Sequence, residues 1–291
     1  MRKKTKVAKA ADFKTYEAVA DAEIAKAVAN TESPFKISVR FIGGLTANQQ
    51  RAFETAADRW TRVIVGDLPS VVIDGEVIDD ILIFAEGRTI DGVGGILGQA
   101  GPSWLRPASS GRTAFIPARG KMTFDTADLA NMEQNNTLVD VITHEMGHVL
   151  GIGTIWTFKN LLQGAGTSNP IFTGGQAQIE YGRLKGTGAT PVPVANVGGP
   201  GTADSHWREL VFRNELMTGS IAGINNPLSA LTVASLQDLG YEVDVNAAET
   251  YNLPNLMELA EGGFLTNDEQ VVELEMVLPN LPLVLPDESL Q

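Results

Sequence analysis

The sequence predicts an α+β fold, in which a mixed, twisted sheet with two long helices precedes a mostly irregular C-terminal part. Three observations support this prediction. Apolar and polar residues alternate along Phe35–Ile42, which is typical of a half-buried strand. Apolar residues recur at helical spacing in Thr46–Val65 and in Thr137–Leu150. From Gly153 to about Asn246 the chain is rich in glycine, proline, asparagine and threonine, which favours loops over regular elements.

The remaining elements follow from shorter patterns. Residues 1–33 mix alanine, lysine and acidic residues, so they predict either a short surface helix or a disordered segment. We expect Asn135 or Asn136 to cap the second long helix and Gly151 to end it. One further helix is expected near Leu231–Leu239. Short apolar segments predict four more strands, which are Val71–Ile73, Ile81–Phe84, Ile96–Gln99 and Met122–Asp125.

The composition limits the chemistry that the chain can perform. Its 291 residues suit one large domain or two intimate subdomains and can bury a sizeable core. It contains no cysteine, which excludes a disulfide scaffold, a thiol nucleophile and a thiolate metal site. The net charge of −13 argues against a nucleic-acid or anionic-membrane partner. A site that needs imidazole must draw on only three histidines.

The negative charge is concentrated at the C-terminal end. Residues 214–291 carry 13 acidic residues and no lysine or arginine, which accounts for the whole net charge of −13. This segment is a solvated acidic tail, an element that docks on the domain or on a partner, or an export or calcium-responsive signal. The predicted organisation has four parts: an N-terminal extension (1–34), an N-terminal subdomain (35–152), a C-terminal subdomain (153–247) and an acidic tail (248–291).

No targeting or membrane segment is predicted. The basic residues Met1–Lys9 are followed by the mixed and charged segment Ala10–Glu17, so a secretory signal peptide is not expected. No stretch approaches the roughly 18 apolar residues of a membrane-spanning helix. The localisation stays open between an extracellular one, reached without such a signal, and a cytoplasmic one.

A metal-binding pattern lies within the second long helix. His144 and His148, in the sequence HEMGH, are four residues apart and therefore share one helix face, so both imidazoles can reach one ion. A catalytic zinc ion takes three protein ligands and keeps a fourth position open. Glu145, which follows the first histidine, can polarise a zinc-bound water and pass its proton to a leaving amine. The pattern therefore predicts a zinc site with Glu145 as general base.

The third zinc ligand does not follow from the helix itself. Thr154 stands three residues after Gly151, where a continuous HExxHxxGxxH pattern would place a histidine. His206, beside Trp207, is the only remaining histidine. From the residues alone, His206 is either the third ligand or an ordinary packed or surface side chain.

Three segments together resemble the leishmanolysin-like branch of the metzincin metallopeptidases. They are HEMGHVLGIGTIW (144–156), SHWRELVFRNELMTG (205–219) and NPLSALTVASLQDLGY (226–241). In that branch a long insertion separates the HExxHxxG helix from the third histidine, and a turn with a methionine follows. The match keeps this order over roughly Asp140–Tyr241. Phe172–Ala177 and Pro191–Thr202 resemble the bacterial members, whereas the well-known eukaryotic members are rich in cysteine.

The resemblance implies a role for each residue of the site. His144, His148 and His206 resemble the zinc ligands of the family, and Glu145 resembles its general base. Met217 resembles the methionine of the turn beneath the metal, where its role is packing. The implied fold is metzincin-like, with the zinc cleft between the N-terminal and C-terminal subdomains. The implied activity is zinc-dependent endopeptidase cleavage of proteins or peptides.

Two further sites are expected, each with an open alternative. The candidate rim of the cleft, where an extended peptide would add as a strand, comprises Ile96, Leu97, Gly98 and Gln99. The alternative is an ordinary buried strand or a loop. Asp125 and Asp128 could bind a structural calcium ion, but we favour solvated or helix-capping carboxylates.

A second class of function also fits the motif. The chain could be a non-catalytic, zinc-stabilised binding or surface module that keeps the site for stability. Structural zinc sites are closed by four ligands, whereas this sequence offers three histidines and an additional glutamate suited to act as a base. We therefore favour the peptidase. The oligomeric state and the natural substrate are not predicted.

Overall fold

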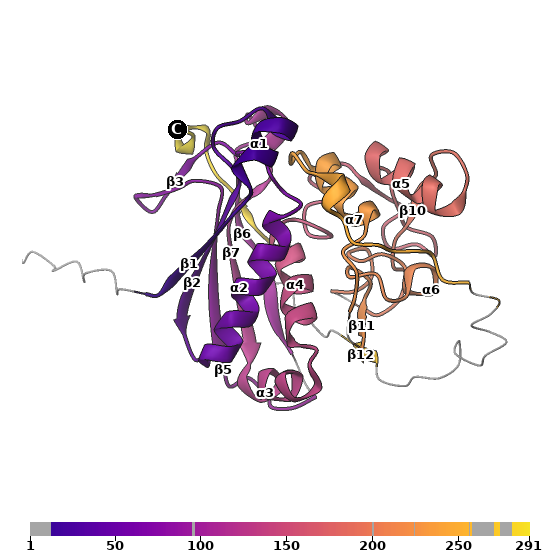
Figure 1. Cartoon of the computed structure of the whole chain (residues 1–291), viewed down its shortest axis with the longest axis horizontal. Helices are drawn as coiled ribbons and strands as arrows, with labels where there is room; N and C mark the ends of the chain where they lie inside the picture. The colour runs from indigo at the N-terminus through magenta and orange to yellow at the C-terminus, as the bar shows by residue number, and fades with distance from the viewer. Residues whose placement is uncertain are drawn as a thin grey trace, which may run out of the picture.

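The chain folds into a sheet-centred part and a loop-rich part, which lie side by side in the computed structural model (Figure 1). The structure describes residues 13–94, 97–199, 201–223, 225–255, 257, 271–273 and 281–291. The first half of the chain builds the sheet and its helices, and most of the second half builds the shorter elements. The predicted mixed α+β fold is confirmed.

A mixed six-stranded sheet forms the centre of the first part. Its order is β1 (Thr15–Val19), β2 (Lys36–Gly43), β5 (Ile81–Arg88), β7 (Pro117–Asp125), β6 (Gly98–Leu105) and β13 (Leu283–Val284). β2, β5 and β7 are parallel to one another, whereas β1 runs antiparallel to β2 and β6 runs antiparallel to β7. β13 pairs in parallel with β6. The predicted strands Phe35–Ile42, Ile81–Phe84 and Met122–Asp125 are confirmed as β2, β5 and β7. The predicted Val71–Ile73 is β3, which forms a separate hairpin with β4 (Glu76–Ile78).

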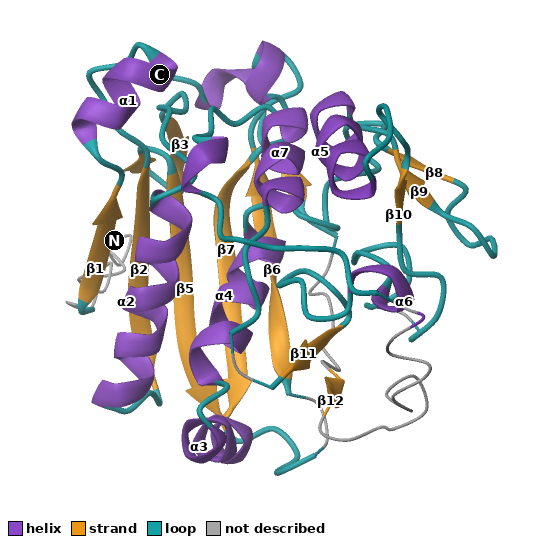
Figure 2. Cartoon of the chain, turned by 45° about the vertical axis from the view of Figure 1, so that its right-hand side comes forward, coloured by secondary structure: helices purple, strands orange, loops and turns teal. Residues whose placement is uncertain are grey.

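Two long helices, α2 (Ala47–Thr61) and α4 (Leu138–Val149), cover one face of this sheet (Figure 2). α2 begins with a capping box in which Thr46 and Gln49 exchange side-chain and backbone hydrogen bonds. The two helices pack on each other, and the indole N–H of Trp60 donates to the carbonyl of Thr143 at 2.9 Å. The helix pair that the sequence predicts is thus confirmed. Its packing places α4 between the sheet and the second part of the molecule.

The first of the two long helices, α2, is shorter than predicted. It ends at Thr61, although apolar residues at helical spacing continue to Val65. The N–H of Val65 instead donates to the carbonyl of Glu242 at 2.9 Å. The N–H of Asp244 donates to the carbonyl of Val63 at the same distance. Val63 and Val65 are therefore buried because they pair with the distant segment at Glu242 and Asp244. Local periodicity cannot distinguish this cause of burial from a helix face.

The predicted cap of the second long helix is wrong. A helix that the sequence did not predict, α3 (Thr126–Asn135), ends immediately before it. Asn136 has a φ of +57°, so it terminates α3 in the left-handed conformation that asparagine tolerates. Thr137 is the residue that precedes α4, without a side-chain cap. The predicted end of the helix is confirmed, because Gly151 follows Leu150 with a φ of +112°.

Both ends of the described chain join the sheet. β1 pairs with β2 and precedes α1 (Ala22–Ala29), so the helix, one of the two alternatives predicted for residues 1–33, is present, and an unpredicted strand accompanies it. Residues 1–12 of that prediction lie outside the described residues. β13 pairs with Trp104 and Leu105 of β6. Leu285 packs into an apolar cluster on the face opposite α2 and α4, formed with Val71, Ile73, Ile78, Leu82 and Ala118. The last described segment therefore docks on the domain.

The second part contains more regular structure than expected. α7 (Ala230–Leu239) confirms the predicted helix, but two further helices are present. The additional elements are α5 (Gly175–Lys185), α6 (Glu209–Phe212), β8 (Leu162–Gln163), β9 (Ile171–Phe172), β10 (Val192–Pro193), β11 (Ser220–Ala222) and β12 (Val271–Glu273). Short 3-10 turns occur at Gly111–Thr113, Val245–Ala247 and Asp287–Ser289.

α5 depends on a tertiary cap. Its sequence carries glycines at both ends and in its interior, which weakens a helix. Asp238 of α7 accepts the backbone N–H groups of Gln176 and Ala177, both at 2.9 Å. A carboxylate from another helix therefore satisfies the first turn of α5. None of the described helices is long and apolar enough to cross a membrane.

Candidate metal centre

The three histidines of the chain meet at one point. The Nε2 atoms of His144 and His148 lie 3.0 Å apart, and each lies 3.0 Å or less from Nε2 of His206. All three side chains are buried, with at most 3% of their surface exposed. An ion bound at the usual zinc–nitrogen distance of about 2.0–2.1 Å fits such a triangle. The structure thus brings His206 to the helix histidines, across 58 positions from His148.

Each imidazole is oriented by a backbone carbonyl. Nδ1 of His144 donates to the carbonyl of Leu216 at 2.6 Å, and Nδ1 of His148 donates to that of Ile152 at 2.8 Å. Nδ1 of His206 lies 3.1 Å from the carbonyl of Thr202. Since a carbonyl can only accept, these bonds place the ring proton on Nδ1 and leave the Nε2 lone pairs facing one another. This is the protonation state that metal ligands require.

The burial of the site keeps its imidazoles neutral. Burial, followed by the charge of His148, lowers the pKa of His144 well below its usual value. Burial lowers the pKa of His148 to about 4 and the pKa of His206 well below its usual value. Three neutral imidazoles with converging lone pairs repel one another unless a cation lies between them, so the donor set fits a divalent ion.

Glu145 is a buried carboxylate beside this triangle. Its side chain is completely buried, and neither oxygen has a hydrogen-bond partner among the described residues. Burial raises the pKa of Glu145 well above its usual value. A buried carboxylate without partners is costly, so this side chain is suited to act on a molecule bound at the metal centre.

The chain just after α4 supplies the carbonyl that accepts the ring N–H of His148. Gly151 has a φ of +112°, which favours glycine, and the chain turns there so that Ile152 O meets the ring of His148. The hydroxyl of Thr154 donates to the carbonyl of His148 at 2.8 Å. Thr154 therefore stabilises the end of the helix instead of reaching the metal centre.

A turn at Met217 lies under the helix histidines. Leu216, which accepts the bond from His144, directly precedes Met217. The sulfur of Met217 lies close to Gly147, between the two helix histidines, since a Cβ added there would stand 2.8 Å from it. The N–H of Trp207 donates to the carbonyl of Met217 at 2.9 Å, which ties this turn to the segment of His206. Met217 is fully buried.

The candidate cleft rim is only partly where the sequence predicts it. The strand is β6, and it begins at Gly98 and continues to Leu105, so it is shifted from Ile96–Gln99. Ile96 lies outside the described residues, Leu97 is buried and Gln99 is exposed. On the side away from β7, the only described strand that pairs with β6 is β13, at Trp104 and Leu105. The backbone edge from Gly98 to Ser103 is therefore unpaired within the described part of the chain.

Asp125 acts as a capping carboxylate, as we favoured. It accepts the N–H of Ala127 in the first turn of α3 at 2.7 Å. Its other oxygen accepts the N–H groups of Ile90, Asp91 and Gly92. Asp128 accepts the N–H of Gly94 at 3.1 Å. Both aspartates thus hold the loop before β6 against α3.

These features define a class of protein. A His-Glu-x-x-His helix with a distant third histidine, in a mixed α+β fold, is the arrangement of a zinc metallopeptidase. Among the described residues this metal-ligand group contains no further histidine or carboxylate. Three protein ligands leave a coordination position open, as a catalytic zinc site requires.

Comparison with known proteins gives the family. The family model for leishmanolysin, peptidase M8, matches residues 108–268, which is more than half of the chain. The chain therefore belongs to the leishmanolysin family of metallopeptidases. It is 29% identical over 146 residues to a leishmanolysin homolog of Crithidia fasciculata, and 31% identical over 144 residues to leishmanolysin of Leishmania donovani. Each alignment covers 46% of this chain, but only 21% and 24% of those relatives.

Proposed function

We propose that the chain is a zinc-dependent endopeptidase that hydrolyses peptide bonds of proteins. One observation carries the proposal: the unpartnered carboxylate of Glu145 lies next to three histidines whose Nε2 atoms converge within 3.0 Å. His144, His148 and His206 would hold the zinc ion through these atoms. Membership of the leishmanolysin family supports the same activity.

The zinc ion and the protein would contribute different parts of the reaction. Zinc, when bound, makes water a nucleophile near neutral pH and polarises the carbonyl under attack. Glu145 accepts the proton of the attacking water and transfers it to the leaving amine, so it acts first as base and then as acid. The buried surroundings of Glu145 raise its pKa, which makes the carboxylate a stronger base towards the attacking water. Met217 packs beneath the histidines and keeps their helix in place.

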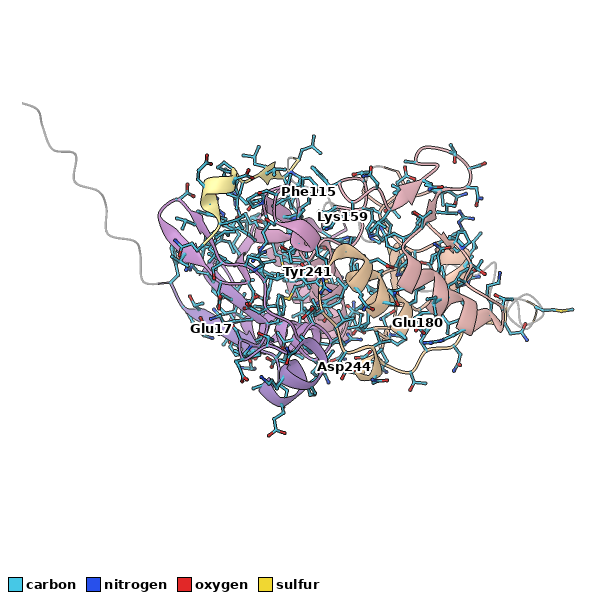
Figure 3. The ribbon with its side chains drawn as sticks, turned by 90° about the horizontal axis from the view of Figure 1, so that it is seen from above. Glu17, Phe115, Lys159, Glu180, Tyr241 and Asp244 are labelled. Atoms are coloured by element: carbon cyan, nitrogen blue, oxygen red, sulfur yellow. The ribbon has the colours of Figure 1, made fainter. Side chains whose placement is uncertain are left out.

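A metzincin-like organisation would give this site its substrate cleft. The N-terminal subdomain (35–152) supplies the two helix histidines, and the C-terminal subdomain (153–247) supplies His206 and Met217, so the cleft would run between them. Figure 3 labels Tyr241 where the two parts meet, and its hydroxyl donates to Leu150 at the end of α4 at 2.8 Å. The unpaired edge of β6 would bind an extended peptide as an additional strand.

The burial of the centre favours one other candidate function. A zinc-stabilised binding module would also bury its ligands, and the three histidines and Glu145 are only 0–3% exposed here. A structural zinc site, however, closes with four ligands, and the group of described residues holds three. The unpartnered Glu145 would also serve no purpose in such a site.

Zinc content measured together with casein cleavage separates the two functions. For a peptidase, cleavage stops when a chelator removes the zinc and returns when zinc is added back. For a binding module, zinc raises the Tm of the protein but casein stays intact at every zinc level. A protein that neither binds zinc nor cleaves casein would contradict both.

A further inference from the structure

Glu215 is a second buried carboxylate near the metal centre, and the catalytic scheme does not use it. Its side chain is completely buried between the Met217 turn and the start of α7. Oε2 accepts the N–H of Met217 at 2.6 Å. Oε1 accepts the hydroxyls of Ser229 at 2.6 Å and Thr232 at 2.5 Å, and the N–H of Ser229 at 3.2 Å. Burial raises the pKa of Glu215, and these four donors oppose that shift.

The first connection to the metal centre runs through Leu216. The bond from the N–H of Met217 to the Glu215 carboxylate closes a short ring of backbone around Leu216. That ring fixes the direction of the Leu216 carbonyl, which accepts Nδ1 of His144 at 2.6 Å. The orientation of one predicted zinc ligand therefore depends on a carboxylate that does not touch it.

The second connection reaches the segment of the third histidine. The indole N–H of Trp207, the residue after His206, donates to the hydroxyl of Thr232 at 2.8 Å. That hydroxyl in turn donates to Glu215. One carboxylate thus holds three separate segments, which are the Met217 turn, the strand-like segment at Trp207 and the first turn of α7.

The charge of Glu215 suits this role. Among the described residues no lysine or arginine forms an ion pair with it, so its charge is balanced only by hydrogen-bond donors. An amide in its place would present an N–H₂ group to these donors and lose at least one bond. Burying a carboxylate in this way costs free energy, which indicates that its geometry matters at this position.

We propose that Glu215 is a positioning residue of the metal centre, which orients His144 through Leu216 and places His206 through Thr232 and Trp207. The proposal rests on zinc binding at the three histidines. It predicts that Glu215 determines how tightly the chain holds zinc, in addition to how stable the fold is. Losses from such outer partners are typically about 10- to 100-fold in metal affinity.

The test compares Glu215→Gln with Asp80→Asn in the full chain. Asp80 is also a buried carboxylate and accepts the N–H groups of Lys36 and Leu68, both at 2.8 Å, outside the metal centre. Zinc affinity is measured by competition with a chelator, and the cobalt-substituted proteins are compared by their visible absorption. We expect Glu215→Gln to weaken zinc binding about 10- to 100-fold and to shift the cobalt spectrum. Asp80→Asn lowers stability but leaves both readouts unchanged.

A milder variant keeps the test decisive if Glu215→Gln does not fold. Thr232→Val retains the carboxylate but removes its link to Trp207, and it should weaken zinc binding by a smaller factor. Zinc affinity and a cobalt spectrum equal to wild type, in Glu215→Gln or in the folded Thr232→Val, would overturn the proposal. A wild type that binds no zinc would overturn the metal centre itself, which distinguishes the two failures.

Discussion

Gly147 and Met217 are in direct contact beneath the metal centre. A Cβ on Gly147 would stand 2.8 Å from Sδ of Met217 and 2.9 Å from the ring of Trp60. Both neighbours are fully buried, so neither can move away freely. The glycine between the two helix histidines therefore lets α4 approach the turn that orients His144.

Gly147→Ala should destabilise the protein, although alanine favours a helix by about 1 kcal/mol over glycine. Overpacking of this kind costs about 1–3 kcal/mol, and we expect weaker zinc binding as well. Gly175→Ala is the matched control, because it also lies in a helix and a Cβ there meets no atom within 4 Å. Urea unfolding of both variants measures the effect. A Gly147→Ala protein at least as stable as Gly175→Ala would show that the contact carries no strain.

Arg59 connects the two long helices to the end of the second part. Its guanidinium donates to Asp140 at 3.0 Å, to Glu249 at 2.6 Å and to the carbonyl of Asn226 at 2.6 Å, and it is 8% exposed. Arg59→Met leaves two carboxylates without their partner and should cost about 3–5 kcal/mol of unfolding free energy. Lys26→Met, which removes an exposed ion pair, should cost less than about 1 kcal/mol. Equal losses in the two variants would contradict the role of this network.

The pair of Glu249 and Arg59 should make stability depend on pH in the acid range. Burial raises the pKa of Glu249, but the hydrogen bonds from Arg59 and the N–H of Leu228 and the charge of Arg59 outweigh it, so the pKa lies below 4.5. A lowered folded-state pKa means that the stabilisation is complete above the unfolded value and is lost as the pH falls through the folded one. The difference in unfolding free energy between wild type and Glu249→Gln should shrink from neutral pH to about pH 3. A difference that stays constant over this range would refute the assignment.

The docked C-terminal segment should contribute to stability through Leu285. This side chain is 5% exposed in the cluster with Val71 and Leu82, whereas Leu283, two residues earlier, is 58% exposed. Leu285→Ala should lower the unfolding free energy by about 2–5 kcal/mol. Leu283→Ala should change it by no more than about 0.5 kcal/mol. Thermal unfolding distinguishes them, and equal Tm values for the two variants would mean that the segment does not dock in solution.

The elements that the sequence predicted well carry their information locally. The alternation of β2, the capping signal of α2 and the paired histidines of α4 are all visible within a few residues. Two of the elements that it missed, α5 and β13, depend on distant partners. α5 needs Asp238. β13 needs β6, because Leu283 pairs with Trp104, which lies 179 positions earlier in the chain.

The residues of the metal centre also differ in how far local sequence patterns predict them. His144, Glu145 and His148 form a pattern in one helix, so their joint role could be predicted from spacing. His206 was assigned through a family resemblance, because no local signal separates a ligand from a packed histidine. Glu215 was missed altogether, since its role appears only when Ser229 and Thr232 are brought to it by the fold.

The most direct test of the central claim is the cleavage rate of Glu145→Gln with its zinc content measured in the same sample. The claim is that Glu145 acts as a base beside a zinc ion held by three histidines. We expect this variant to hold as much zinc as the wild type and to cleave casein at least about 100-fold more slowly. A zinc-loaded Glu145→Gln protein that cleaves at the wild-type rate would contradict the claim.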